Sequence, residues 1–277
     1  LSLVGAILTE PCSPEADYGV FYIDALTYQP MCGAGTLSVA KALVETGMVK
    51  RVEPETKIVL ETPTGLVTVY VKWENHMVAS INLENVPAFL YRKDLHIDLA
   101  GYGDVSVDIG YGGNFFVLAD VHSLGLTITK DTVNLLRSLS KDILAAANKV
   151  IKVAHPTNPA INYLDQVLFC QNVPEEDGGY LAQCIFGDAQ ADISPCGTGT
   201  STRLAQRYFR GLIGLEETFV QKSVCGGAFH AKGLRETTLG GVPAIVPYVS
   251  CSDVHITGFN HLIVEENDKL KNGFVSW

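Results

Sequence analysis

The chain has 277 residues, 47% of them hydrophobic, and its 20 basic and 30 acidic residues give a net charge of −10. This composition is typical of a folded globular protein, and the negative charge argues against nucleic acid as a partner. The sequence contains no run of about 18 apolar residues, so it indicates no membrane-spanning segment.

The termini and the cysteines indicate a cellular compartment. The first ten residues lack the basic and apolar pattern of a secretory signal and do not begin with Met, so we expect an incomplete N-terminus. The seven cysteines are Cys12, Cys32, Cys170, Cys184, Cys196, Cys225 and Cys251. An odd number without a Cys-x-x-Cys pair argues against a disulfide framework and a zinc ribbon. Cysteines without a disulfide framework indicate a reducing compartment, so we expect a cytoplasmic protein. The histidines also lack metal-ligand spacing, so we expect no bound metal.

In chain order, the first predicted helix follows Cys32. It runs from near Thr36 to Gly47, with apolar residues at helical spacing. Residues 57–65 and 66–71 are rich in β-branched side chains around a Pro/Gly turn and predict two strands. Residues 112–115 fit two interpretations equally, a turn facing a ligand or a tight turn with a β-bulge.

The second part of the chain repeats this order. Residues 135–153 predict a helix that passes from one half of the protein to the other. Another predicted helix follows Cys196 and ends at Gly211, and residues 218–224 and 228–230 predict strands around a Gly-Gly turn.

A duplicated motif divides the chain. Cys-Gly-x-Gly-Thr begins at Cys32 and again at Cys196, and in each copy a glycine closes the predicted helix fifteen positions after the cysteine. We therefore predict an α+β protein of two pseudo-symmetric halves, residues 1–145 and 146–277, with the C-terminal residues free to return to the first half. A cleft between the halves would close on a small ligand.

The duplicated motif also predicts acid/base chemistry. A helix N-terminus lowers the pKa of a thiol, and a thiolate is the form of cysteine that acts as a base. The glycines after each cysteine let backbone N–H groups approach an anion closely. Two thiols on opposite faces of one bound α-carbon would exchange roles, one removing a proton while the other supplies one. Such a reaction requires no pyridoxal cofactor.

A structural interpretation competes with the catalytic one. A single cysteine in a glycine-rich helix start is more often structural than catalytic, and only its duplication in matched context favours chemistry. For the other five cysteines we favour the role of small buried hydrophobic residues.

Several segments resemble the proline racemase family. Met31-Cys-Gly-Ala-Gly-Thr36 and Asp192-Ile-Ser-Pro-Cys-Gly-Thr-Gly-Thr200 are similar to its two catalytic loops, and residues 14–17, 112–115 and 256–259 add support. The resemblance covers essentially the whole chain. It implies the two-domain, pseudo-symmetric fold of diaminopimelate epimerase, an active site between the halves and a homodimer.

The resemblance also implies roles for individual residues. Cys32 and Cys196 resemble the two acid/base thiols, and Asp192 resembles the carboxylate that binds the α-nitrogen of the substrate. The residues that resemble the backbone donors to the substrate carboxylate are Gly33, Ala34, Gly197 and Thr198. The sequence departs from the family pattern at Ala34, where His is usual, and at Ile193, where Arg is common. The opening segment of family members, before the region that matches Leu1, is also absent.

Within the family, dehydratases of trans-3-hydroxyproline have Ser or Thr in place of one cysteine, whereas this chain has both. We therefore predict a cofactor-independent isomerase, a racemase or 2-epimerase of proline or hydroxyproline whose partner is a small amino acid. A trans-3-hydroxyproline dehydratase and a non-catalytic imino-acid binding protein remain as alternatives.

Overall fold

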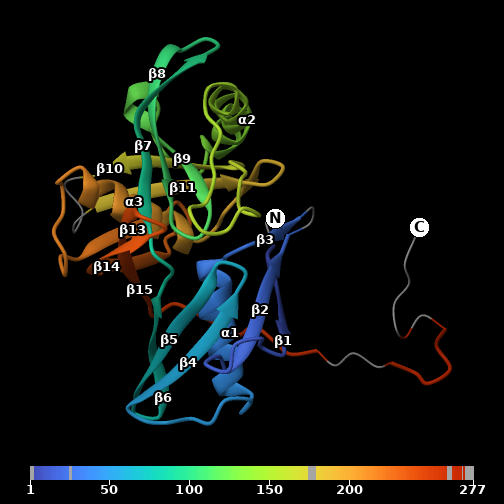
Figure 1. Cartoon of the computed structure of the whole chain (residues 1–277). Helices are drawn as coiled ribbons and strands as arrows, with labels where there is room; N and C mark the ends of the chain where they lie inside the picture. The colour runs from blue at the N-terminus through green and yellow to red at the C-terminus, as the bar shows by residue number, and fades with distance from the viewer. Residues whose placement is uncertain (1–2, 25–26, 174–178, 261–263, 270, 272–277) are drawn as a thin grey trace.

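The computed structural model describes residues 3–24, 27–173, 179–260, 264–269 and 271. The protein is α+β, as predicted, with helices α1 and α3 among strands in two parts of the molecule (Figure 1). Along the chain the elements are β1 (Gly5–Thr9), β2 (Tyr18–Ile23), β3 (Tyr28–Gln29), α1 (Gly33–Glu45), β4 (Glu55–Thr62), β5 (Gly65–Glu74), β6 (Met77–Glu84), β7 (Phe89–Leu99), β8 (Gly103–Tyr111), β9 (Phe115–Asp120), η1 (Val121–Leu124), α2 (Val133–Val150), β10 (Gln166–Asn172), β11 (Gly179–Phe186), β12 (Gln190–Ala191), α3 (Gly197–Phe209), β13 (Phe219–Ser223), β14 (Ala228–Leu239) and β15 (Val242–Cys251). The three predicted helices and the four predicted strands all have counterparts among these elements.

One continuous path of paired strands connects the two parts. Its order is β1-β2-β4-β5-β6-β15-β14-β13-β11-β10-β9-β8-β7, with β3 paired to β2 and β12 to β11. Most pairs are antiparallel, but β2 and β4, β9 and β10, and β11 and β13 are parallel, so the sheet is mixed. The pairing of β6 with β15 joins the two parts.

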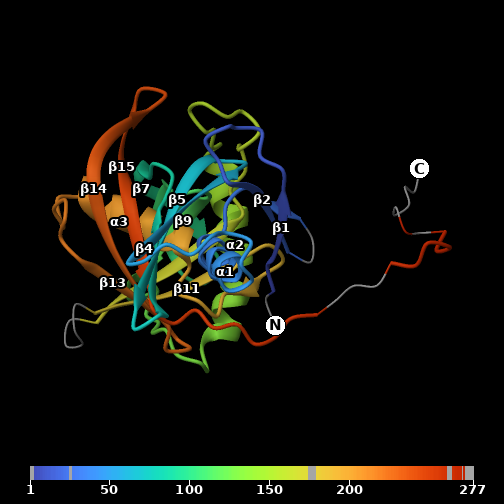
Figure 2. The same cartoon turned by 90° about the horizontal axis from the view of Figure 1, so that it is seen from below.

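Helix α1 fills the core of the first part. It contacts β1, β5 and β6, and Figure 2 views it along its axis with strands around it. Its apolar positions Leu37, Ala40, Leu43 and Val44, which the sequence spacing singles out, are all buried. Burial of this stripe explains why the segment is held as a helix.

Helix α3 is the central helix of the second part. It contacts β7, β8, β14 and β15, and every residue from Gly197 to Ala205 is buried. Helix α2 lies on the other side of these strands, against β7, β10 and β11, rather than between the two parts. Its buried face includes Leu136, Leu139 and Ile143.

The predicted division near residue 145 stays a prediction, but the strand pairing favours an earlier one. Strand β9 pairs in parallel with β10, and α3 packs on β7 and β8, so these strands share the core of the second part. The segment 85–88 between β6 and β7 is the favoured boundary. After β15 the chain returns to α1, where Lys41 Nζ donates a hydrogen bond to the carbonyl oxygen of Val254 at 2.6 Å.

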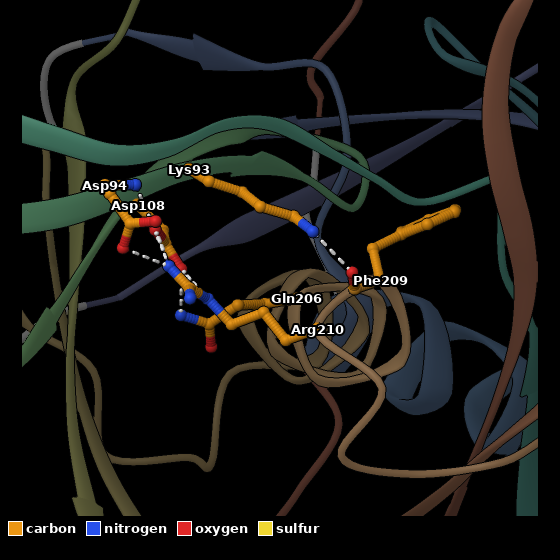
Figure 3. Close-up of polar contacts among 6 residues, drawn as sticks. All are labelled: Lys93, Asp94, Asp108, Gln206, Phe209 and Arg210. Carbon is orange, nitrogen blue, oxygen red and sulfur yellow. Dashed lines mark hydrogen bonds and ion pairs between the residues drawn. The ribbon is translucent and has the colours of Figure 1, made fainter.

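The C-terminal end of α3 is anchored to β7 and β8 by charge (Figure 3). Arg210 binds Asp108 with two hydrogen bonds of 2.7 and 2.8 Å, and Gln206 donates a third to the same carboxylate at 2.7 Å. Lys93 Nζ donates to the carbonyl oxygen of Phe209 at 2.6 Å, where the helix macrodipole favours a cation. These contacts fix the position of α3 and therefore of the residue at its other end, Cys196.

Replacing Asp108 by alanine is expected to lower the free energy of unfolding by about 3 kcal/mol, because it leaves Arg210 without its buried partner. Burial raises the pKa of Asp108, but hydrogen bonds from Arg210 and Gln206 outweigh it and hold the pKa below its ordinary value. The stabilisation is therefore present above the unfolded pKa of about 4 and is lost as pH falls through the lower folded pKa. Urea unfolding at pH 7 and at successively lower pH measures both effects.

The matched control for this variant is Asp104→Ala on the same strand, where the carboxylate is exposed and pairs only with His96. It should change stability by less than about 0.5 kcal/mol. An equal loss in the two variants would contradict the anchoring role of Asp108.

None of the helices in the described part of the chain is long and apolar enough to cross a membrane. All seven cysteines are free.

Candidate active site

The two motif cysteines are the N-cap residues of α1 and α3. The Sγ atom of Cys32 accepts a hydrogen bond from the N–H of Gly35 at 3.3 Å, and that of Cys196 accepts one from Gly199 at 3.3 Å. Each helix therefore offers an N–H group to the sulfur of its own cap. The start of a helix favours negative charge, and both sulfurs lie at such a position.

The two helix N-termini meet at their first glycines. A methyl carbon built on Gly33 would lie 2.7 Å from the Cα of Gly197, and one built on Gly197 would lie 2.7 Å from the Cα of Gly33. Real side-chain carbons do not approach a backbone atom this closely, so only glycine fits at either position. This contact brings the two cysteine loops together.

The backbone of Cys196 differs from that of Cys32. Cys196 has φ 64° and ψ 102°, in a region that non-glycine residues rarely adopt, whereas Cys32 is extended at φ −138°. Cys196 is held there on both sides, because its N–H donates to Ser194 Oγ at 3.0 Å and its carbonyl accepts from the N–H of Thr200 at 2.7 Å. Such strain is typical of functional sites.

A cavity of about 710 Å³ lies at this junction. All seven residues predicted to form the site line it: Cys32, Gly33, Ala34, Asp192, Cys196, Gly197 and Thr198. They come from both parts of the fold, as a site between two halves requires. The remaining lining includes Phe186, Ile193 and Val254, so much of the wall is apolar.

Two asparagines outside the predicted site residues connect the loops. Asn114, in the turn between β8 and β9, donates to the carbonyl oxygen of Met31 at 2.8 Å and to Thr198 Oγ1 at 3.4 Å. Asn85 donates to the carbonyl oxygen of Gly112 at 3.0 Å and to Ser201 Oγ at 2.9 Å. The turn at residues 112–115 therefore braces both cysteine loops. The Gly-Gly-Asn sequence of that turn was a signal for it, whereas nothing in the sequence around Asn85 pointed to the site.

Further buried side chains support each helix start. Tyr22 and Thr36 share a hydrogen bond of 2.6 Å beneath α1. Under α3, Gln221 donates to the carbonyl oxygen of Pro195 at 2.7 Å and to Thr200 Oγ1 at 2.8 Å. These contacts fix the loops without contributing an acid or base to the cavity.

Burial overrides the expected lowering of the Cys32 pKa. Burial raises the pKa of Cys32 to about 12, the N–H of Gly35 lowers it in part, and the nearby charges of Asp192 and Cys196 raise it further. At Cys32 the stabilisation of a thiolate by the helix start is therefore smaller than the cost of burial.

Asp192 directly precedes the second loop and lines the cavity. Its Oδ1 accepts from the N–H of Ser194 at 2.8 Å, and its own N–H donates to the carbonyl oxygen of Cys184 at 3.0 Å. Burial raises the pKa of this carboxyl, which hydrogen bonds from Ser194 offset in part. A ligand cation would remove much of this cost by pairing with the carboxylate.

A third thiol lies at the site. Cys184, in β11, is buried and lines the same cavity as Cys32 and Cys196. From the sequence Cys184 is expected to be a buried core residue, because a cysteine in a β-rich segment carries no signal of its own. Only the pairing of β11 with β12 brings Cys184 next to Asp192.

Comparison with known proteins agrees with this geometry. The profile of a family described as "Proline racemase" matches residues 2–275. The chain is 38% identical over 99% of its length to trans-3-hydroxy-L-proline dehydratase of Burkholderia cenocepacia, and 37% identical over 99% to proline racemase of Clostridioides difficile, covering 81% of each.

A solved structure extends the match. The structure of a hydroxyproline epimerase from Agrobacterium vitis, with bound trans-4-hydroxy-L-proline, superposes with a TM-score of 0.88 at 30% identity. The match covers 98% of this chain and 77% of that one.

Proposed function

Because the chain belongs to the proline racemase family, whose racemases and epimerases are isomerases, we propose that it inverts the α-carbon of proline or a hydroxyproline with two thiols. The observation that carries the proposal is that Cys32 and Cys196 cap two helices whose N-terminal glycines touch, and that both line one cavity. One bound α-carbon would then be accessible to a thiol from each side.

The helix starts supply the binding site for the substrate carboxylate. The first N–H groups of a helix have no partner within it, and those of Gly33, Ala34, Gly197 and Thr198 belong to the first turns of α1 and α3. A carboxylate between the two turns would accept from both helices. Stabilising its negative charge also stabilises the carbanion that forms when the α-hydrogen leaves.

The two thiols take opposite roles in each direction. In one direction the thiol of Cys32 donates its proton to the α-carbon while Cys196, as thiolate, accepts the α-hydrogen from the other face. After one turnover Cys196 carries the proton and Cys32 is the thiolate, with the N–H of Gly35 donating to it. The opposite enantiomer then reacts by the reverse path, so no external acid or base is consumed.

The alternative activities predict different products. A trans-3-hydroxyproline dehydratase would remove the α-hydrogen and the 3-hydroxyl, and a relative 38% identical bears that name. Elimination requires a base on one face only, so two thiols favour inversion. A binding protein would leave the substrate unchanged.

Nuclear magnetic resonance of L-proline, trans-4-hydroxy-L-proline and trans-3-hydroxy-L-proline in deuterated water separates these activities. Inversion replaces the α-hydrogen by deuterium and yields the opposite configuration at the α-carbon. Loss of the 3-hydroxyl from the third compound without inversion of the others would contradict the proposal. An unchanged spectrum with all three would leave only a binding role.

Asp192→Asn is expected to raise the KM for proline at least about tenfold, because the substrate nitrogen loses a charge-assisted partner. Pyrrole-2-carboxylate, whose ring nitrogen is uncharged, should lose much less affinity in the same variant. Steady-state kinetics and calorimetric titration of the analogue measure the two effects.

The control for this variant is Asp188→Asn, an exposed carboxylate near the same hairpin that pairs with Lys141. It should leave both values unchanged. An unchanged KM in Asp192→Asn would remove this carboxylate from the binding site.

The remaining expectations complete the proposal. We expect the reaction to need no cofactor, the protein to act as a homodimer and the compartment to be the cytoplasm. The substrate is a small imino acid, and the apolar wall around Phe186, Ile193 and Val254 supports a ring without charged substituents.

A further inference from the structure

Three acidic groups gather on one wall of the cavity. The sulfur atoms of Cys184 and Cys196 and a carboxylate oxygen of Asp192 all lie within 4.8 Å of one another. Within the described ranges this is the only cluster of three or more His, Cys, Asp or Glu side chains with that spacing. Cys32 is not part of the cluster, which shares Cys196 with the proposed pair of acid/base thiols and adds Cys184 and Asp192 to it.

The cluster is unfavourable without a cation. Asp192 is half-buried, and in the described part of the chain no Lys or Arg forms an ion pair with it. Cys184 and Cys196 are both buried free thiols beside this carboxylate. Because such groups repel one another as anions, a divalent cation that binds them gains free energy by removing this repulsion.

We propose that Cys184, Asp192 and Cys196 form a binding site for a thiophilic divalent cation, with Zn²⁺ as the fitting ion, and that its binding inhibits the enzyme. The binding part stands on the cluster alone, whereas the inhibition rests on the proposed function. Two thiolates and one carboxylate form a ligand set typical of zinc, because soft sulfur ligands bind Zn²⁺ in preference to Mg²⁺ or Ca²⁺.

The spacing fits this ion after a small adjustment. Zinc lies about 2.3 Å from sulfur and about 2.0–2.2 Å from carboxylate oxygen, so its tetrahedral ligands are roughly 3.5–3.8 Å apart. Ligand atoms already within 4.8 Å need to approach by at most about 1.3 Å. The cluster lines the cavity, which leaves the fourth position open to water.

The N-terminus of α3 supports the charge of the occupied site. Two thiolates, one carboxylate and one Zn²⁺ sum to a single negative charge, and the helix start at Cys196 favours it. Both thiols release their protons when the metal binds, so affinity should rise with pH.

Bound zinc would block the reaction at two of its groups. It occupies the sulfur of Cys196 that accepts the α-hydrogen, and it neutralises the Asp192 carboxylate that pairs with the substrate nitrogen. Zinc and substrate therefore compete. Cys184 has no part in the proton transfer and supplies the third ligand, so this residue distinguishes the metal site from the reaction.

The test uses the full chain carrying Cys12→Ser and Cys225→Ser, which removes the two exposed thiols. In this background, we compare Cys184→Ala with Cys170→Ala, a buried cysteine of the adjacent strand β10. Zinc affinity is measured by competition with a chromophoric chelator. Co²⁺ then serves as a spectroscopic probe, because its near-ultraviolet sulfur charge-transfer band grows with the number of bound thiolates.

The parent protein should bind one Zn²⁺ per chain. Cys184→Ala should raise the Kd for Zn²⁺ at least about tenfold and weaken the cobalt band, while Cys170→Ala should change neither. Zinc inhibition, relative to the metal-free turnover of each variant, should weaken in parallel in Cys184→Ala.

Two results would overturn the proposal. The first is that the parent protein binds no stoichiometric zinc. The second is that Cys184→Ala has the same Kd for Zn²⁺ as the parent, which would place the metal on the Cys32 and Cys196 pair. Zinc binding that depends on Cys184 in a protein that inverts no imino acid would support the metal site and contradict the proposed function instead.

Discussion

Cys32→Ser and Cys196→Ser should each lower the racemisation of proline by about 10²- to 10⁴-fold, the range that one positioned acid or base contributes. Serine keeps the size of the side chain and the hydrogen bond from the helix N–H, but its hydroxyl is a far weaker acid than a thiol. Inversion requires both faces of the α-carbon, so loss of either thiol should stop it. Polarimetry or chiral chromatography of the product mixture measures the rate.

Cys225→Ser is the control for this pair, because Cys225 is exposed. It should retain the activity of the parent protein. All three variants should unfold at nearly the same temperature, which separates loss of chemistry from loss of structure. Turnover above a tenth of the parent value in Cys32→Ser or Cys196→Ser would contradict the two-thiol mechanism.

Gly33→Ala and Gly197→Ala should each abolish most of the activity although they alter no reactive group. The new methyl carbon would lie 2.7 Å from the Cα of the glycine on the other helix, and the obstructing atoms are backbone. The two helix starts must then separate, which moves Cys32 away from Cys196. A displacement of about 1 Å at a catalytic centre reduces turnover by roughly 10²-fold, and overpacking costs about 1–3 kcal/mol of stability.

Gly258→Ala provides the matched control, since a methyl carbon there meets no atom within 4 Å and the position has no positive φ. Its activity and melting temperature should equal those of the parent. If Gly33→Ala kept full activity, the contact between α1 and α3 would not be what sets the spacing of the thiols.

Local signals in the sequence were sufficient to predict several of the helices and strands and the residues of the proposed site. The apolar positions of α1 predicted its buried face, and the repeated Cys-Gly-x-Gly-Thr motif predicted two cysteines at helix starts. Both are local properties, because helix periodicity and capping depend on residues within a few positions of one another. The two motif copies and the family resemblance, which added Asp192, together pointed to seven residues that line one cavity.

The path of the sheet could not be derived in the same way. Residues 89–120 were assigned to the first half by their position in the chain, yet β9 pairs with β10 and α3 packs on β7 and β8. Which strand pairs with which depends on contacts between distant residues, and alternating apolar patterns do not distinguish one partner from another.

What the sequence by itself determined is the α+β class and the place of two matched cysteine loops, because a short motif that occurs twice encodes both loops; the proposed chemistry starts from that motif. The tertiary structure alone decided the surroundings of Cys32, where burial outweighs the helix start and raises the pKa of the thiol. It also decided the positions of Asn85, Asn114 and Cys184, which reach the site from elements far from either motif. Burial and proximity arise only when the chain has folded, and no local pattern records them.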